Sequence, residues 1–305
     1  MSLYDIVIIG SGPAGLSAAI YARRAELKAV VIEKNMISGG QVLNTYEVDN
    51  YPGLPGTSGF DLSAKMREHA DKLGAGFVED TVTSVDFTGR IKRVICENET
   101  YEAKTVIIAS GAHHRKLGAA GEDMLAGSGV SYCATCDGAF FRGKTTAVVG
   151  GGDVALEDAI FLSRMCKKVY VIHRRDEFRG AKSLQNRLMS LDNIEVIWDS
   201  VVDAIEGDGR VERLQLQNKK TGEKSALPVD GVFIAVGITP DSKEYEGQLE
   251  LDAQGYIVAG EDGKTSVEGV FAAGDVRTKA RRQIITAAAD GANCVASAER
   301  YLAGE

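Results

Sequence analysis

Two cysteines with two residues between them are the part of this sequence best suited to redox chemistry. They lie in the segment C-A-T-C-D at 133–137, where Asp137 directly follows Cys136. This spacing allows the Cα separation of about 4.4–6.8 Å that a disulfide needs. Because so short a loop adds only about 2 kcal/mol of chain-entropy stabilisation, we expect the bond to be easy to reduce. Asp137 is placed to exchange a proton with the thiols of Cys133 and Cys136.

Three interpretations of this pair compete: a redox-active dithiol, two inert buried thiols, and part of a zinc site. A structural zinc site needs four ligands, yet the chain has one C-x-x-C segment and four histidines without ligand spacing. We therefore favour the redox pair and expect no metal. The remaining cysteines are expected to be small apolar core residues: Cys96, Cys166 and Cys294.

A glycine-rich loop near the start of the chain predicts a dinucleotide site. The segment G-S-G-P-A-G at 10–15 follows an apolar run typical of a buried strand and precedes a helical pattern. Gly10 permits the tight turn, Gly12 lets the backbone approach a pyrophosphate, and Gly15 allows close packing of helix and strand. The helix N-terminus offers free N–H groups to the phosphates. Glu33, at the end of the next predicted strand, can accept hydrogen bonds from ribose hydroxyls.

A second loop of the same kind, G-G-G-D-V-A at 150–155, ends differently. The strand after it finishes at His173 and is followed by Arg174, Arg175 and Arg179, with no acid at the ribose position. Arginines at this position suit a 2′-phosphate. Two charge-assisted contacts would favour NADPH over NADH by roughly 3–6 kcal/mol as an upper limit.

The elements around the two loops predict an α/β protein with two Rossmann-like dinucleotide-binding domains. Strand, helix and strand follow one another at 3–10, 13–26 and 28–33, and again at 145–150, 154–165 and 168–173. Further strands are predicted at 82–96, 105–111 and 230–237, and helices at 61–73 and 282–302. The second unit is expected to be inserted into the first, which gives domains of residues 1–115 with 246–305, and 116–245.

Composition limits the partners and the location. The chain has 305 residues and a formal net charge of −8, which argues against a nucleic-acid surface. It contains no apolar run of about 18 residues, so no membrane span is expected. Its first residues lack the pattern of a signal peptide. These features predict a cytoplasmic protein.

The motifs together resemble one family over essentially all 305 residues, the low-molecular-weight, bacterial-type thioredoxin reductases, which are FAD- and NADPH-dependent disulfide oxidoreductases. The resemblance rests on the two glycine loops and on these further segments: S-G-G-Q at 38–41, E-V-D-N-Y-P-G at 47–53, C-A-T-C-D at 133–137, H-R-R-D-E-F-R at 173–179, G-V-F-A-A-G-D at 269–275 and R-Q at 282–283.

The resemblance implies a role for each matching residue. Cys133, Cys136 and Asp137 would be catalytic, with Cys136 nearest the flavin. The discontinuous first domain would bind FAD through Gly10, Gly12, Pro13, Ala14, Gly15, Glu33, Lys34, Gly40, Gln41, Asn50, Gly274, Asp275, Arg282, Gln283 and Ile284. The inserted domain would bind NADPH through Gly150, Gly152, Asp153, Ala155, His173, Arg174, Arg175 and Arg179.

The family also implies a homodimer that reduces thioredoxin, with a rotation of the inserted domain between half-reactions about crossings near residues 115 and 245. Tyr46 and Ile284 depart from the threonine and alanine common in relatives. Reductases of a glutaredoxin-like or peroxide-reducing partner and ferredoxin-linked thioredoxin reductases remain alternatives. The intact NADPH motifs disfavour a ferredoxin-linked enzyme, and the chain begins too close to its first strand for the extra N-terminal region of a peroxide-reducing system.

Overall fold

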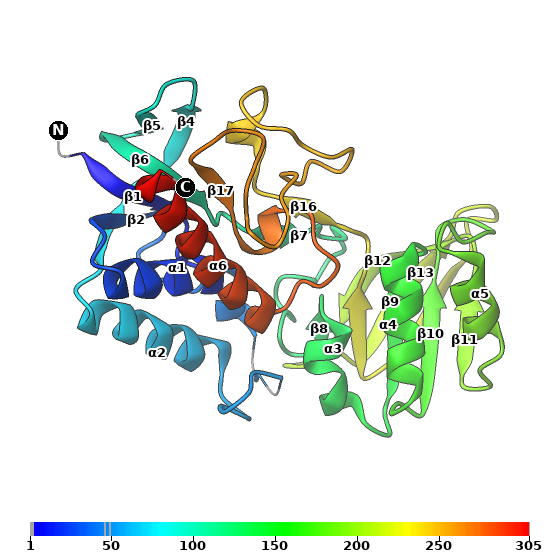
Figure 1. The fold of residues 1–305 in the computed structure, drawn as a ribbon. Coiled ribbons are helices and arrows are strands. Elements are labelled where there is room, and N and C mark those ends of the chain that lie inside the picture. The colour runs from blue at the N-terminus through cyan, green and yellow to red at the C-terminus, as the bar shows by residue number, and fades with distance from the viewer. Residues whose placement is uncertain (1–2, 46, 49, 305) are drawn as a thin grey trace. The chain divides into compact units, whose positions relative to one another are not determined.

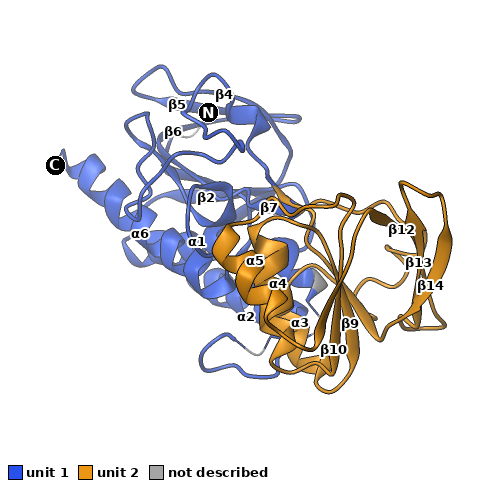
Figure 2. Ribbon diagram, turned by 90° about the vertical axis from the view of Figure 1, so that its right-hand side faces the viewer, with its two compact units in different colours: residues 1–113, 239–305 blue, residues 114–238 orange. Residues whose placement is uncertain are grey.

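The computed structural model describes residues 3–45, 47–48 and 50–304. The chain divides into two compact units, shown in Figure 2: unit 1 comprises residues 1–113 and 239–305, and unit 2 comprises residues 114–238. The chain crosses between them in β7 (Ala112–His114) and β16 (Ile238–Pro240), which pair with each other. The second crossing comes earlier than residue 245 because Tyr245 is buried in the core of unit 1.

Unit 1 contains a seven-stranded sheet. Its strands are β1 (Tyr4–Ile9), β2 (Ala29–Glu33), β3 (Gly76–Glu79), β4 (Val82–Asp86), β5 (Lys92–Cys96), β6 (Thr100–Ile108) and β17 (Val270–Ala272). The order is β3-β2-β1-β6-β5-β4, and β17 pairs with the end of β6. β1, β2, β3, β6 and β17 are mutually parallel, whereas β5 is antiparallel to both of its neighbours. The parallel part therefore gathers its carboxyl ends at one edge.

Three long helices cover one face of this sheet (Figure 1). They are α1 (Pro13–Arg24), α2 (Gly59–Lys72) and α6 (Ile284–Ala303), and short 3₁₀ turns occur at η1 (Gly40–Asn44), η3 (Lys243–Tyr245) and η4 (Gly274–Val276). α1 begins at Pro13, whose fixed φ suits a first helical position, and it has two arginines in its last turn. α1 packs against both α2 and α6. Alanines on the buried faces of α1 and α6 allow this close approach.

Unit 2 repeats the plan with a smaller sheet. Its strands are β8 (Val130–Ser131), β9 (Thr145–Val149), β10 (Lys168–Ile172), β11 (Ile194–Ile197) and β15 (Gly231–Ile234), parallel in the order β11-β10-β9-β15-β8. One face packs against α4 (Asp153–Ser163) and α5 (Lys182–Met189). The other packs against an antiparallel sheet of β12 (Ser200–Glu206), β13 (Arg213–Asn218) and β14 (Lys224–Pro228). The short helix α3 (Ala134–Asp137) and the turn η2 (Gly138–Phe141) follow β8.

The structure confirms the α/β class and the two dinucleotide-binding folds. The predicted helices are present, with ends displaced by a few residues, and Cys96, Cys166 and Cys294 are buried free thiols as expected. The sheet β12-β13-β14 was not predicted, although its alternating apolar and polar residues carry the period of half-buried strands. In the part of the chain that the structure describes, no helix is long and apolar enough to cross a membrane.

Candidate redox and dinucleotide sites

The first glycine loop leaves room for a ligand at one position and none at two others. A Cβ on Gly15 would clash with the carbonyl oxygen of Gly10, so helix and loop are in direct backbone contact. Gly10 has φ +98° and its backbone lies against Ala109 at the end of β6. A Cβ on Gly12 would meet no atom within 4 Å. The open side of the loop is therefore at Gly12, at the N-terminus of α1.

Glu33 stands at the end of β2 with its carboxylate held in place. Oε2 accepts hydrogen bonds from both the amide and the hydroxyl of Ser11, each at 2.8 Å. Oε1 accepts from the amide of Asn35 at 3.0 Å and from its Nδ2 at 3.1 Å. Ser11 thus connects the glycine loop to Glu33, the acid predicted to bind a ribose. Lys34 is exposed beside them.

The residues predicted on the flavin side come together from distant segments. Asn50 Nδ2 donates to Gln283 Oε1 at 2.9 Å, across 233 positions of sequence. Gln41 in η1 donates through Nε2 to the carbonyl of Ala112. Gly40 lies beside the loop, since a Cβ on it would be 3.5 Å from the Cα of Gly12. Ile284 is the first residue of α6, and Tyr46 lies outside the described residues.

Two buried polar atoms in this region have no hydrogen-bond partner among the described residues: Asp275 Oδ1 and Arg282 Nε. Burial raises the pKa of Asp275, and the charges of Lys279 and Arg282 oppose that rise. Arg282 also lies over the ring of Tyr256, with 4.0 Å between its Cζ and the ring centroid. Buried polar groups are normally satisfied, so an unpaired donor and acceptor fit a polar ligand. Together with the open space at Gly12, they fit a flavin dinucleotide.

The second glycine loop has the same pattern, except that an alanine replaces the third glycine. A Cβ on Gly150 would be 2.5 Å from the carbonyl oxygen of Ala235, and Gly152, like Gly12, faces open space. Ala155 stands where the first loop has Gly15, and its Cβ packs beside Gly150. Asp153 Oδ1 accepts the amide of Ala181 at 2.6 Å and so fastens the segment before α5. The space at Gly152 fits a second dinucleotide.

The positive group after β10 is attached to this loop through its backbone. The carbonyl of Gly151 accepts the amides of Arg179 at 2.8 Å and Gly180 at 3.2 Å. Arg174, Arg175 and Arg179 are exposed, and none of them forms an ion pair with the residues that the structure describes. Three unpaired guanidinium groups are therefore displayed at the rim of the loop.

His173 takes a supporting position that sequence reasoning did not anticipate. Its ring is buried directly beneath Gly151, and a Cβ there would overlap the imidazole. The ring contacts Phe178 and Trp198, with centroids 5.6 and 6.3 Å away. Burial lowers the pKa of His173, so the neutral ring is favoured. Its contact with a cofactor stays a prediction, whereas its packing under the loop is a feature of the structure.

Cys133 and Cys136 form a disulfide at the start of α3, with a Cα separation of 5.3 Å. Ser131 links this disulfide to the acid that follows it. Its hydroxyl donates to Asp137 Oδ2 at 2.6 Å and accepts the amide of Cys133 at 3.1 Å. Asp137 Oδ1 is buried with no partner among the described residues. Burial raises the pKa of Asp137, and the bond from Ser131 opposes the rise.

Sequence reasoning missed Ser11 and Ser131 as functional residues. Ser11 lies within the first glycine loop and Ser131 lies two residues before the C-x-x-C segment, yet serine hydroxyls near glycine or cysteine are common and carry no signal of their own. Only the fold shows that each one holds a carboxylate, Glu33 or Asp137, at a predicted site.

Comparisons with known proteins agree with this geometry. The family described as pyridine nucleotide-disulphide oxidoreductase matches residues 4–291. Thioredoxin reductase from Listeria innocua is 46% identical over 301 residues, covering 98% of this chain and 94% of the relative. The crystal structure of thioredoxin reductase from Streptococcus pyogenes is 45% identical, with a TM-score of 0.95 and 99% of each chain covered.

A third relative has a similar sequence and a lower structural score. Thioredoxin reductase from Lactococcus lactis, described as in an FR conformation, is 42% identical and covers 99% of this chain and 100% of its own, with a TM-score of 0.68. The matches span both units and the segment that carries the disulfide. This chain belongs to the pyridine nucleotide-disulphide oxidoreductase family and, within it, to the low-molecular-weight thioredoxin reductases.

Proposed function

We propose that this protein uses NADPH to reduce the disulfide of a thioredoxin, with FAD as its bound cofactor. The observation that carries the proposal is the Cys133–Cys136 disulfide in a chain with two dinucleotide loops. Hydrogen bonds of Ser131 connect this disulfide to the buried carboxyl group of Asp137. FAD, when bound, supplies the chemistry that converts a hydride from a nicotinamide into an electron pair for a disulfide.

Unit 1 would hold FAD. Gly10, Gly12, Pro13, Ala14 and Gly15 offer the helix N-terminus to the pyrophosphate, and Glu33 faces the ribose. The flavin side would be lined by Gly40, Gln41, Asn50, Gly274, Asp275, Arg282, Gln283 and Ile284. The unpaired Asp275 Oδ1 and Arg282 Nε support this assignment, because a polar ligand would satisfy both atoms.

Unit 2 would hold NADPH through Gly150, Gly152, Asp153, Ala155 and the three exposed arginines. The arginines support a 2′-phosphate because their charges have no partner among the described residues. Two nearby carboxylates share one lysine: Lys220 Nζ is 2.8 Å from Asp176 Oδ2 and 3.1 Å from Asp199 Oδ2. The three exposed arginines would supply the positive charge that the phosphate meets.

The dithiol would act by exchange with the partner disulfide. One thiolate attacks a sulfur of thioredoxin, forming a mixed disulfide and releasing a thioredoxin thiolate. The second thiolate then attacks the mixed disulfide, which restores Cys133–Cys136 and releases the second thiol of reduced thioredoxin. Asp137 would hold or supply the proton at Oδ1, and Ser131 keeps that carboxyl group oriented.

Because the disulfide and the NADPH loop both belong to unit 2, we propose that unit 2 moves relative to unit 1 about β7 and β16. The solved structures from Streptococcus pyogenes and Lactococcus lactis have nearly equal sequence identity to this chain and cover almost all of it, but their TM-scores are 0.95 and 0.68. Such a pair is expected of two rigid domains that change their relative placement. An engineered disulfide that locks the units together should stop turnover and preserve one half-reaction; full turnover would refute the movement.

Anaerobic titration tests the proposed function directly. NADPH should bleach the flavin absorbance at far lower concentrations than NADH, and oxidised thioredoxin should then restore it. Cys136→Ser should lose thioredoxin reduction while flavin reduction by NADPH persists. Normal thioredoxin turnover by that variant, or faster reduction of a glutaredoxin-like partner than of thioredoxin, would contradict the assignment.

The pH dependence of disulfide exchange tests Asp137. The hydroxyl of Ser131 stabilises the carboxylate, so Ser131→Ala should raise the pKa of Asp137 further and move to higher pH the limb of the rate profile that reports its protonation. Ser131→Thr keeps a hydroxyl and should restore the profile. An unchanged limb in Ser131→Ala would remove Asp137 from the proton transfer.

We further propose that the protein is a cytoplasmic homodimer. Sedimentation equilibrium of the FAD-loaded protein should give twice the chain mass, and cell fractionation should recover the activity with cytoplasmic markers. A monomer with full activity would overturn the dimer.

A further inference from the structure

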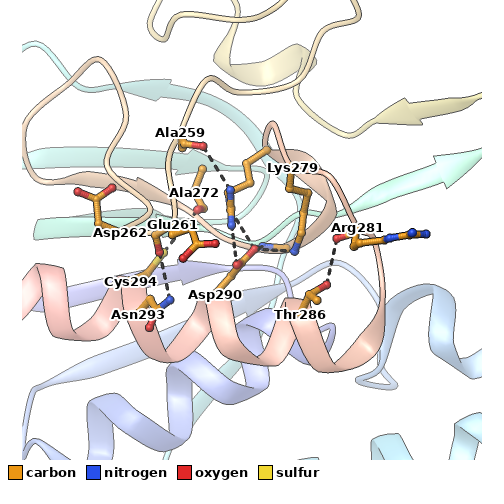
Figure 3. Close-up of polar contacts among 12 residues, drawn as sticks. Ala259, Glu261, Asp262, Ala272, Lys279, Arg281, Thr286, Asp290, Asn293 and Cys294 are labelled. Carbon is orange, nitrogen blue, oxygen red and sulfur yellow. Dashed lines mark hydrogen bonds and ion pairs between the residues drawn. The ribbon is translucent and has the colours of Figure 1, made fainter. Parts of the chain in front are cut away.

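One face of α6 is fastened to two neighbouring loops by a row of polar contacts (Figure 3). Most of these contacts use a backbone carbonyl as acceptor. Thr286 donates to the carbonyl of Arg281 at 3.1 Å, Asn293 to that of Glu261 at 3.1 Å, and Ser297 to that of Asp262 at 2.8 Å. Asp290 differs because it brings a charge into the row.

Asp290 is buried and pairs with two buried cations. Arg277 Nε and Nη2 donate to Asp290 Oδ2 at 2.9 Å and Oδ1 at 2.7 Å, which makes a two-bond fork, and Lys279 Nζ donates to Oδ2 at 2.8 Å. The three side chains are 6–8% exposed. Although burial opposes ionisation, the bonds from Arg277 and Lys279 hold the pKa of Asp290 below its usual value. The carboxylate is therefore charged at neutral pH.

The same carboxylate holds a backbone segment that the proposed function assigns to FAD. The amide of Gly274 donates to Asp290 Oδ2 at 2.9 Å. Gly274 has φ +77°, and a Cβ on it would be 3.0 Å from the Cβ of Ala14. Gly291, next to Asp290, lies against the backbone of Ala14 so closely that a Cβ would clash there. The Asp290–Gly291 step thus fixes the Gly274–Asp275 segment against the start of α1.

The charges of this cluster do not cancel. Two cations meet one carboxylate, which leaves a net positive charge directly beside Asp275. The charge of Lys279 reaches that residue, since it opposes the burial-induced rise in the pKa of Asp275. Asp275 Oδ1 has no hydrogen-bond partner among the described residues. The cations that Asp290 holds therefore act on the segment assigned to FAD, where Asp275 Oδ1 is an acceptor that a donor group of the ligand would satisfy.

We propose that Asp290 is a positioning residue for FAD: it holds Gly274–Asp275 against the N-terminus of α1 and keeps Arg277 and Lys279 beside that segment. Asp290 itself does not contact the cofactor. The inference rests on the proposed function, because it assumes that unit 1 is the FAD site. It predicts that FAD affinity depends on Asp290 more strongly than the stability of the apoprotein explains.

The test compares Asp290→Asn with a matched control on the same helix. Ser297→Ala removes a partly buried hydrogen bond two turns further along α6 without touching Gly274. The flavin-free proteins are titrated with FAD, and their thermal unfolding is followed with and without FAD. Asp290→Asn should weaken FAD binding by about 10-fold or more, because it removes a charged acceptor. Ser297→Ala should lower the melting temperature and leave FAD affinity unchanged.

A second variant keeps the inference falsifiable if Asp290→Asn does not fold. Asp290→Glu retains the charge and its pairing, but its extra methylene displaces the oxygens from the amide of Gly274. It should fold and bind FAD several-fold more weakly, by about the strength of one hydrogen bond. If Asp290→Asn or Asp290→Glu folds and binds FAD with wild-type affinity, the inference is wrong and the proposed function is unaffected. If the wild-type protein does not bind FAD, the proposed function fails and the inference fails with it.

Discussion

The two dinucleotide loops have the same backbone arrangement. They differ in how closely the loop contacts the following helix and in the charged residues that lie beside it. In unit 1, helix and loop touch so closely that Gly15 admits no side chain, whereas unit 2 accepts Ala155 at the same place. The acid after the first loop, Glu33, is held by four hydrogen bonds. The arginines after the second loop are free of ion pairs with the described residues. The first site therefore has a carboxylate fixed in one orientation, whereas the second displays exposed positive side chains.

The largest effect is expected where the first loop is most tightly closed. Gly15→Ala should yield protein without flavin and with unit 1 destabilised by about 1–3 kcal/mol or more, because the new Cβ would strike the Gly10 backbone. The reciprocal change Ala155→Gly should cost only about 1 kcal/mol, the helix-propensity difference. Flavin content and thermal unfolding measure both. Equal tolerance at the two positions would remove the distinction between the loops.

The next effect tests the arginines of the second loop. Replacing Arg174, Arg175 or Arg179 by Gln should raise the KM for NADPH by about 10-fold or more where the side chain contacts the 2′-phosphate, since such a contact is worth about 1.5–3 kcal/mol. The KM for NADH should hardly change, and so should FAD content. An equal rise in KM for NADPH and NADH would show that the arginines do not recognise the 2′-phosphate.

A smaller effect is expected from the support of Glu33. Ser11→Ala removes a hydrogen bond from its carboxylate and should weaken FAD binding by roughly 1 kcal/mol, about five-fold. Asn35→Ala removes a single bond on the other carboxylate oxygen and provides a matched comparison. FAD titration of the flavin-free proteins measures both. If neither change is felt, the ribose does not depend on the orientation of Glu33.

The smallest effect concerns Lys220, which pairs with Asp176 and Asp199 on the surface of unit 2. Lys220→Met should expose two carboxylates near the arginines and raise the KM for NADPH a few-fold at low salt, with little change for NADH. Because exposed ion pairs are worth about 0–1 kcal/mol and are screened, the effect should fade as salt is added. A salt-independent change would point to packing of the lysine stem instead.

Most of the candidate site was predictable because its motifs are local. The glycine loops, the C-x-x-C pair and the arginine group each encode backbone geometry or charge within a few residues, and the strand–helix–strand periodicity around them is strong. The β12-β13-β14 sheet was not predicted, and the second crossing, expected near residue 245, lies at residues 238–239. Short amphipathic strands carry weak signals, and a domain boundary depends on which core buries a residue such as Tyr245.

The sequence by itself determined the α/β class, the order of the two nucleotide loops and the dithiol with its neighbouring acid, because each depends on residues that are adjacent in the chain. The tertiary structure alone decided the contacts between distant segments: Asn50 with Gln283 across 233 positions, and Asp290 with the amide of Gly274. Such pairs form only when packing brings two elements to the same place. The spacing of residues along the chain does not indicate which serine or aspartate will lie at such a contact.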